Sequence, residues 1–337
     1  MSDVQAYIGR ELGRFTSEIL EFLRIPSVSA QSHHDADTRR TAEWLRDKME
    51  GAGLEGEVHE TDGHPVVLGE WRGASSDAPT VLVYGHYDVQ PAEPLELWDS
   101  PPFEPEFRDG RLYARGSTDD KGQLYLHIKA AEAHLKDAGS LPINLIVLAE
   151  GEEEVGSPNL VPFVEAHKER LACDAVVISD TGMFAPDLPA LLFSLRGLAY
   201  FELRVVGPLS DLHSGEYGGP VVNPATALGR ILATLHDDQG RITVDGFYDD
   251  VLGWDQETRD GIRDLPFDED EFEESLGAAP AGGEPGFSIL ERLWIRPTCE
   301  INGLLSGYTG EGAKTVLPAE AMAKVSFRLV ADQTPQR

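Results

Sequence analysis

The stretch Thr80–Pro91, T-V-L-V-Y-G-H-Y-D-V-Q-P, contains the features around which the rest of the chain is organised. Its first part, Val81–Tyr84, is a short apolar run rich in β-branched residues, which is typical of a buried strand. Gly85 ends this run, and His86 and Asp88 follow two residues apart, so an extended chain places both side chains on one face. An imidazole beside a carboxylate at the end of a strand can bind a metal ion, with the carboxylate orienting the ring. The alternative for this stretch alone is a polar turn with a hydrogen-bonded histidine.

Apolar strands alternate with amphipathic helices through the first half of the chain. Predicted strands lie at residues 66–71, 80–84, 111–115, 143–148 and 175–178, and predicted helices at 4–23, 37–49, 124–135 and 158–170. This alternation predicts right-handed βαβ units and an α/β fold with a mostly parallel sheet flanked by helices. In such sheets the functional site lies outside the carboxyl ends of the strands.

Acidic clusters follow the other predicted strands at the same edge of the sheet. They are G-S-T-D-D-K-G at Gly116–Gly122, A-E-G-E-E-E-V-G-S at Ala149–Ser157, and Asp180. Each cluster alone is better explained as the cap or first turn of a helix. Their convergence at one edge favours a metal site, because one imidazole with several carboxylates suits zinc, manganese or cobalt. The neighbours Glu153 and Glu154 would offer one carboxylate to a metal and one to accept a proton.

Composition limits the classes of partner and compartment. The chain has 337 residues, with 59 acidic against 28 basic residues and a net charge of −31, which argues against binding to nucleic acid or an anionic membrane. No apolar run approaches the ~20 residues that cross a bilayer. Two cysteines, Cys173 and Cys299, provide no disulfide framework, which favours a cytoplasmic location. No nucleophile elbow or phosphate-binding loop is present, so a serine hydrolase and a nucleotide-binding protein have little support.

The pattern changes after residue 186. Predicted strands at 190–194, 198–206, 299–304 and 321–330 outnumber the one predicted helix at 224–236, and residues 264–285 are acidic and glycine-rich. We therefore expect a catalytic metal-binding domain at residues 1–186 and a smaller α+β domain at residues 187–337. An exposed acidic insertion is expected at about 245–295.

Five motifs taken together resemble those of the carnosinase-type di-zinc metallopeptidases. They are G-H-Y-D-V-Q-P, G-S-T-D-D-K-G, E-G-E-E-E-V-G-S, I-S-D-T and D-L-H-S-G, in this order along nearly the whole chain. The superfamily also includes succinyl-diaminopimelate desuccinylase, aminoacylase and glutamate carboxypeptidase. The resemblance implies a zinc-exopeptidase-like catalytic domain and a lid and dimerisation domain. It also implies two divalent metal ions, zinc first, with manganese and cobalt as alternatives.

The resemblance also implies a role for each matching residue. His86 and Asp180 would bind the first metal, Asp119 would bridge both metals, and Glu154 would bind the second. Asp88 would orient His86, and Glu153 would be the general base. The Asp119–Asp120 peptide bond is expected to be cis.

Three residues of the second domain receive roles in the same way. His213 would reach the site of a partner subunit and stabilise the developing oxyanion. Asn223 and Arg328 match positions that hold the substrate, and an arginine suits a carboxylate. Without the resemblance, His213 would be a turn histidine and Arg328 an exposed strand residue.

The expected function is therefore metal-dependent hydrolysis of dipeptides or short peptides by a homodimer, with Glu153 as general base. One alternative is an N-acyl-amino-acid amidohydrolase with the same machinery, and another is a metal-binding or peptide-binding module without catalysis. The resemblance further calls for a late histidine ligand on the second metal, but the last histidine is His236. From this we expect the chain to be part of a longer polypeptide.

Overall fold

The computed structural model describes residues 3–185, 187–192 and 194–337. The chain folds into two compact units, Met1–Ala190 and Leu191–Arg337. Within the described residues, no helix is both long and apolar enough to span a bilayer. The predicted domain roles and the boundary after residue 186 stay predictions.

A five-stranded sheet with the strand order β1-β2-β6-β3-β7 forms the centre of the first unit. The strands are β1 (Glu55–His59), β2 (Val66–Trp71), β3 (Thr80–His86), β6 (Asn144–Glu150) and β7 (Ala175–Ile178). Strand β3 pairs in parallel with β6 and β7, whereas β2 is antiparallel to both of its neighbours, β1 and β6. All strands except β2 therefore run in one direction, which confirms the predicted α/β fold with a mostly parallel sheet.

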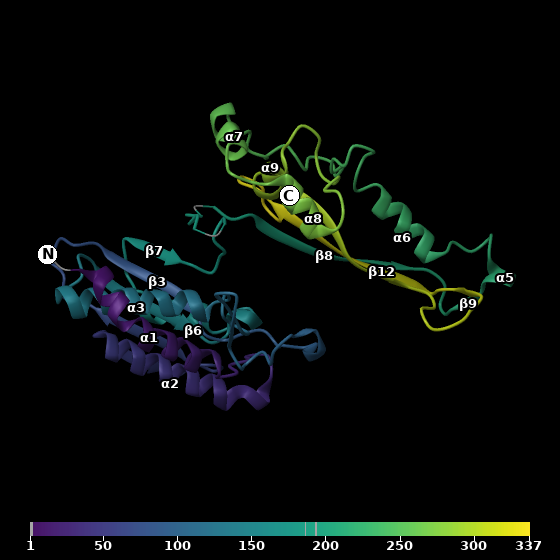
Figure 1. The fold of residues 1–337 in the computed structure, drawn as a ribbon. Helices are drawn as coiled ribbons and strands as arrows, with labels where there is room; N and C mark the ends of the chain where they lie inside the picture. Colours follow the sequence, from purple (N-terminus) through teal and green to yellow (C-terminus); the bar gives the residue numbers. More distant parts are fainter. Residues whose placement is uncertain (1–2, 186, 193) are drawn as a thin grey trace. The chain divides into compact units, whose positions relative to one another are not determined.

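Helices pack on both faces of this sheet. They are α1 (Val4–Leu23), α2 (Asp35–Ala52), α3 (Lys121–Ala138) and α4 (Leu160–His167). Figure 1 shows α1, α2 and α3 on the same side, where Phe22, Leu45 and Ile128 join one buried core. On the other side, Phe163 of α4 packs against Leu82 and neighbouring strand residues. Burying each of these side chains contributes about 1.5–3 kcal/mol to the stability of the fold, so this packing stabilises the strands that lead to the site.

Short elements complete the first unit. Between β3 and α3, the strands β4 (Glu106–Arg108) and β5 (Arg111–Tyr113) form a small hairpin. Single 3₁₀ turns occupy Ser32–His34, Leu95–Leu97 and Glu153–Val155. The last of these turns carries the predicted catalytic glutamates.

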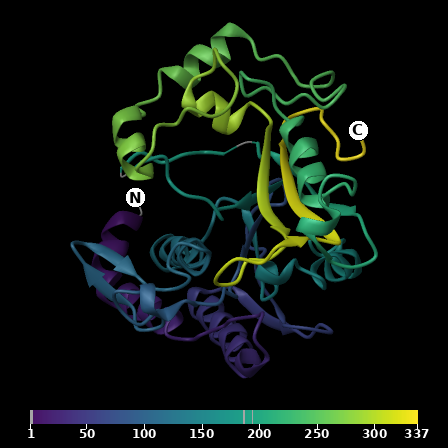
Figure 2. The same ribbon diagram turned by 90° about the vertical axis from the view of Figure 1, so that its right-hand side faces the viewer.

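The second unit is built on a three-stranded antiparallel sheet with the order β10-β12-β8. Its elements are β8 (Gly197–Val206), β9 (Leu212–His213), α5 (Ser214–Tyr217), α6 (Pro224–Ala233), α7 (Gln256–Arg263), α8 (Glu269–Leu276), α9 (Ile289–Trp294), β10 (Thr298–Ser306), β11 (Val316–Leu317) and β12 (Glu320–Leu329). Figure 2 shows α6 beside the yellow strands of this sheet, and Leu228 and Leu232 of α6 are buried against it. Strands β9 and β11 form a separate antiparallel pair.

The predicted acidic insertion contains three short helices, α7, α8 and α9. Helix α8 buries none of its side chains, whereas α9 is held firmly. Glu291 of α9 is fully buried and accepts hydrogen bonds from Arg259 and Arg263 of α7, at 2.6 and 3.1 Å. These charge-assisted bonds give the segment a defined fold despite its acidic composition. The predicted strand at 190–194 includes residue 193, which lies outside the described residues, and residues 190–192 are not in a strand.

Candidate active site

The register of the parallel strands brings the sequence clusters together at one edge. His86, the last residue of β3, pairs with Glu150, the last residue of β6. The segment after β6, which contains Glu153 and Glu154, therefore emerges beside the segment after β3. Strand β7 ends on the other side of β3, so Asp180 also emerges at this edge. This convergence is the arrangement that open α/β sheets use for their functional sites.

The Asp88 carboxylate contacts several of the chain segments that meet at this edge. It is fully buried and accepts the backbone N–H groups of Glu153 and Glu154, at 3.2 and 3.1 Å. It also accepts the Ser29 hydroxyl at 2.6 Å, and one of its oxygens lies 3.4 Å from Nδ1 of His86. Asp88 therefore lies against the histidine and also holds the glutamate-bearing turn in place, and its role in orienting His86 stays a prediction.

The outer nitrogen of His86 faces carboxylates and lacks a hydrogen bond. Nε2 is buried without a hydrogen-bond partner, although it lies 3.1 Å from Oδ1 of Asp119 and 3.7 Å from Oδ2 of Asp180. Tetrahedral zinc with bond lengths of about 2.0–2.2 Å separates its ligand atoms by roughly 3.3 Å. The three side chains thus have the chemistry and the spacing of a metal site, and their ligand atoms all lie within 4.8 Å of one another.

A second group of potential ligands shares the same histidine. His86, Glu153 and Glu154 also offer ligand atoms within 4.8 Å of one another. Gln90 donates to Oε2 of Glu154 at 2.5 Å and so restrains this carboxylate. One imidazole and four carboxylates, each predicted to bind metal or to accept a proton, therefore lie close together. They are His86, Asp119, Glu153, Glu154 and Asp180.

The electrostatics of this edge favour a cation. Burial by itself lowers the pKa of His86, but the carboxylates of Asp88, Asp120 and Asp180 outweigh this effect and raise it to about 10. Burial raises the pKa of Asp120 to about 7, against the opposing effect of His86. Burial is likewise the main cause of the raised pKa of Glu153, with a further contribution from Asp180. A raised pKa suits a carboxylate that accepts and returns a proton near neutral pH.

Helix α3 supplies the carboxylates on its side of the site. Asp120 is its N-cap residue, and Asp119 immediately precedes it. Asp120 is buried and accepts the backbone N–H of His86 at 3.2 Å, whereas Asp119 is exposed and points its carboxylate to Nε2. The peptide bond between them is cis, as expected from the resemblance.

Three residues of the second unit were predicted to act in catalysis or substrate binding, and each has its contacts within that unit. His213 accepts the N–H of Gly215 through Nδ1 at 3.0 Å, and its Nε2 lies 3.1 Å from the Thr315 hydroxyl. Asn223 is the N-cap of α6 and accepts the N–H of Ala225 at 2.9 Å. Arg328 is exposed on β12, opposite Thr298 and Leu198. Their predicted roles in catalysis and substrate binding stay predictions.

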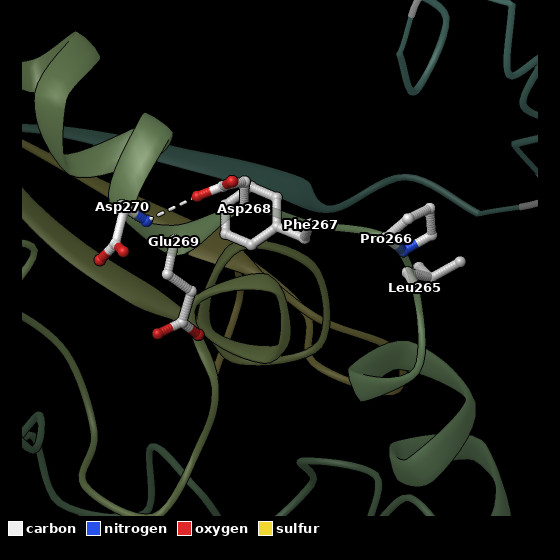
Figure 3. Close-up of a pocket in the computed structure, with 6 residues that line it drawn as sticks. All are labelled: Leu265, Pro266, Phe267, Asp268, Glu269 and Asp270. Atoms are coloured by element: carbon white, nitrogen blue, oxygen red, sulfur yellow. Dashed lines mark hydrogen bonds between the residues drawn. The ribbon is translucent and has the colours of Figure 1, made fainter.

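A depression elsewhere in the second unit has a local structural explanation. It is lined by Leu265–Asp270, at the start of α8. Figure 3 shows the Asp268 carboxylate accepting the N–H of Asp270, which makes it a helix cap, and the lining comes from one short segment. No imidazole or second chain segment contributes, so this depression does not compete with the edge at His86.

Sequence reasoning missed several residues that support the site. Ser29, Gln90 and Asp120 all bond to predicted site residues or to their backbone. Asp120 was detectable because it lies beside Asp119 in the motif. Ser29 lies far away in the chain, in the loop after α1, and nothing in its local sequence indicates a contact with Asp88.

Comparisons with known proteins agree with this geometry. Residues 82–316 match the peptidase family M20/M25/M40. The chain is 35% identical to the Cys-Gly metallodipeptidase dug1 of Schizosaccharomyces pombe over 96% of this chain and 70% of that protein.

Two solved structures are also similar. An M20 family metallo-carboxypeptidase from Sulfolobus solfataricus is 37% identical, with a TM-score of 0.81 over 96% of this chain and 72% of that one. Human carnosine dipeptidase 1 is 30% identical, with a TM-score of 0.76 over 98% of this chain and 72% of that one. The match of fold, of sequence and of the carboxylate cluster around His86 leads to one conclusion: the chain belongs to the peptidase family M20/M25/M40.

Proposed function

We propose that this protein is a metal-dependent dipeptidase that hydrolyses dipeptides or short peptides. The observation that carries the proposal is the buried Nε2 of His86, which lacks a hydrogen bond and faces the carboxylates of Asp119 and Asp180. The similar proteins described as a metallodipeptidase, a carnosine dipeptidase and a metallo-carboxypeptidase support metal-dependent cleavage of peptide bonds. Two of these three descriptions name dipeptidases, which favours dipeptides over longer substrates and over N-acyl amino acids.

Each residue at the edge has a distinct task in this proposal. His86, Asp119 and Asp180 hold one divalent cation, and Glu154 contributes with Asp119 to holding a second. When bound, the cations polarise the scissile carbonyl and lower the pKa of a water molecule. Glu153 accepts the proton of the attacking water and returns it to the leaving amine, a role that its raised pKa supports. Asp88 holds the backbone of Glu153 and Glu154 in register with His86.

The finer assignments of metal, assembly and compartment are also proposals. Zinc is the proposed cation, since one imidazole with carboxylates is an established zinc ligand set, and manganese and cobalt are the alternatives. A homodimer built through the second unit is proposed from the resemblance, with sedimentation at micromolar concentration as its test. A cytoplasmic location is proposed because both cysteines, Cys173 and Cys299, are unpaired thiols.

The decisive experiment combines a substrate panel with a substitution of the general base. Dipeptides, tripeptides and N-acetyl amino acids are incubated with the protein and zinc, manganese or cobalt, and the products are identified by mass spectrometry. We expect dipeptides to be cleaved fastest, and Glu153→Gln to lower kcat about 10²- to 10⁴-fold while metal content is retained. Glu165→Gln, at an exposed position of α4, is the matched control and should behave as the unchanged protein.

Three outcomes would contradict the proposal in different ways. Faster cleavage of N-acetyl amino acids than of any peptide would favour the deacylase alternative. Full turnover by Glu153→Gln would show that Glu153 is not the general base. Tight metal binding without any hydrolysis across the panel would favour a binding module.

A further inference from the structure

The strand that leads to Asp180 is far less buried than β3 and β6, which lead to His86 and to Glu153 and Glu154. This strand, β7, has only exposed side chains, and Val176 and Ile178 are more than half exposed. Its ladder with β3 ends at the pair Tyr84 and Ile178, so Ser179 and Asp180 lie beyond the last paired residue. Neither burial of the strand nor sheet pairing therefore determines where the Asp180 carboxylate lies.

A side-chain contact fixes the chain at this point. The imidazole of His127 on α3 shares a hydrogen bond with the Ser179 hydroxyl, and the distance from Nε2 to Oγ is 2.6 Å. At the opposite end of β7, Asp174 accepts the N–H of Thr80 at 2.8 Å. The strand is thus tied at both ends, and the tie at the site end comes from a helix rather than from β3.

Helix α3 connects this tie to the other carboxylates of the site. His127 follows the N-cap residue Asp120 by 7 residues, which is two helical turns, so both lie on the same face of α3. Asp119 and Asp120 at the start of the helix contact His86, and His127 further along contacts Ser179. One rigid helix therefore relates the position of Asp119 to that of Asp180.

The state of His127 suits this task. It is half-buried, and burial lowers its pKa, which favours the neutral ring over a positive charge beside a cation site. A neutral imidazole can donate to or accept from a serine hydroxyl.

We propose that His127 is a positioning residue that holds the end of β7 through Ser179 and so places the Asp180 carboxylate beside His86 and Asp119. The inference rests on the proposed metal site but not on the identity of the substrate. Outer partners of metal ligands orient them, and their loss typically weakens metal binding about 10- to 100-fold.

The test is a double-mutant cycle read by metal affinity. Zinc binding is measured by competition with a chromophoric chelator for the unchanged protein, His127→Ala, Ser179→Ala and the double variant. Each single variant should bind the tightest zinc ion about 10- to 100-fold more weakly. The double variant should be no weaker than the weaker single variant, because both substitutions remove one shared contact. Excess zinc should restore kcat, since the reacting groups themselves are unchanged.

Controls separate this role from a general loss of folding. His134→Ala, at an exposed position of the same helix, should keep the zinc affinity of the unchanged protein. Cobalt substituted for zinc gives a visible absorption spectrum, which should shift in both single variants because the ligand geometry changes. Thermal unfolding by circular dichroism reports stability independently, and Ser179→Ala removes only one oxygen atom.

The possible results separate the two proposals. Zinc affinity and cobalt spectra like those of the unchanged protein in both single variants would overturn the role of His127. Additive losses in the double variant would also overturn it, because they would show that the two side chains act separately. Failure of the unchanged protein to bind any divalent cation would overturn it together with the metal site. Metal binding without peptide hydrolysis would contradict the proposed function but not the role of His127.

Discussion

The ends of β6 and β7 flank the same strand and carry acidic residues of the same site, yet they are positioned by different means. The side chains of β6 are buried almost throughout, and the turn that follows is bonded to the Asp88 carboxylate. The side chains of β7 are exposed, and its site end has the His127–Ser179 contact. A catalytic base needs a fixed position and a tuned pKa, which burial supplies, whereas a metal ligand needs mainly a fixed position.

This difference predicts that damage at the β6 end is more severe than damage at the β7 end. Substitutions at the two ends can therefore be ranked by their effect on activity. Metal affinity and stability measured beside activity show whether a ligand, a base or only the fold has been disturbed.

The largest effect among the supporting residues is expected for Asp88→Asn. The amide keeps the shape of the carboxylate, but its NH₂ group replaces one of the two accepting oxygens. Either the hydrogen bond from Glu153 to Oδ1 is lost, or those from Glu154 and Ser29 to Oδ2 are lost. Because this residue contacts the histidine and bonds to the backbone of the glutamate turn, we expect kcat/KM to fall by about 100-fold, at the upper end for an outer partner of a metal ligand. Steady-state kinetics at saturating metal measures the effect.

A matched control for this substitution is Asp174→Asn. Asp174 also accepts a backbone N–H, that of Thr80, but it lies at the far end of β7. It should change kcat/KM less than about 3-fold, as its contact is exposed and remote from the ligands. Equal losses in the two variants would contradict the special position of Asp88.

Ser29 and Ser27 offer a sharper comparison within one loop. The Ser29 hydroxyl donates to the Asp88 carboxylate, and the Ser27 hydroxyl donates to the backbone oxygen of Tyr87, both at 2.6 Å. Ser29→Ala should therefore weaken metal binding by about 10-fold, the lower end for an outer partner. Ser27→Ala should lower the free energy of unfolding by about 1 kcal/mol and leave metal affinity unchanged. If both variants lost only stability, the loop would have no role in the site.

The residues predicted to bind metal could be singled out because each follows a strand end and lies in a distinct motif, and their roles as ligands stay predictions. The order of strands, helices and clusters was enough to predict that His86, Asp119, Glu154 and Asp180 would converge, and the structure brings them together. The pattern-based predictions of α1 and of β8, β10 and β12 also agree with the structure to within a few residues. Periodicity is reliable where an element has one buried face.

What the sequence could not reveal are contacts between distant segments. The hydrogen bonds of Ser29 to Asp88 and of His127 to Ser179 join residues separated by 59 and 52 positions. Such contacts depend on packing in three dimensions and have no local pattern. Strand β1 and helices α7 and α8 were also missed, since polar and acidic residues dominate them and their apolar periodicity is weak. Helix α9 was missed because its 6 residues are too few for a periodic pattern.

The smallest effect on activity, and the clearest dependence on pH, is expected where α3 is anchored to α1. Lys129 of α3 lies 2.6 Å from Oε2 of Glu18 on α1, and Tyr125 donates to the same oxygen at 2.9 Å. Burial alone would raise the pKa of Glu18, but Lys129, Tyr125 and Arg14 lower it from its ordinary value of 4.5 to about 2. The anchored helix contains His127 and begins directly after Asp119 and Asp120, so this pair supports the site from a distance.

The direction of the pH dependence follows from the lowered pKa. Glu18 is ionised in the folded protein at pH values at which the unfolded chain would already bind a proton, so its contribution to stability is complete above about pH 4.5 and is lost as the pH falls toward about 2. We therefore expect Glu18→Gln to lower the free energy of unfolding by the same amount at pH 7 and pH 6, and by less at each step from pH 4.5 down to pH 3. Urea unfolding of both proteins at these pH values measures the difference. Peptide hydrolysis at pH 7 should change less than about 2-fold, because the pair lies between α1 and α3 and shares no contact with the site residues. A stability difference that stayed constant down to pH 3 would mean that Glu18 is not the group that titrates. A large loss of activity at pH 7 would mean that the anchor of α3 controls the site more directly than the geometry indicates.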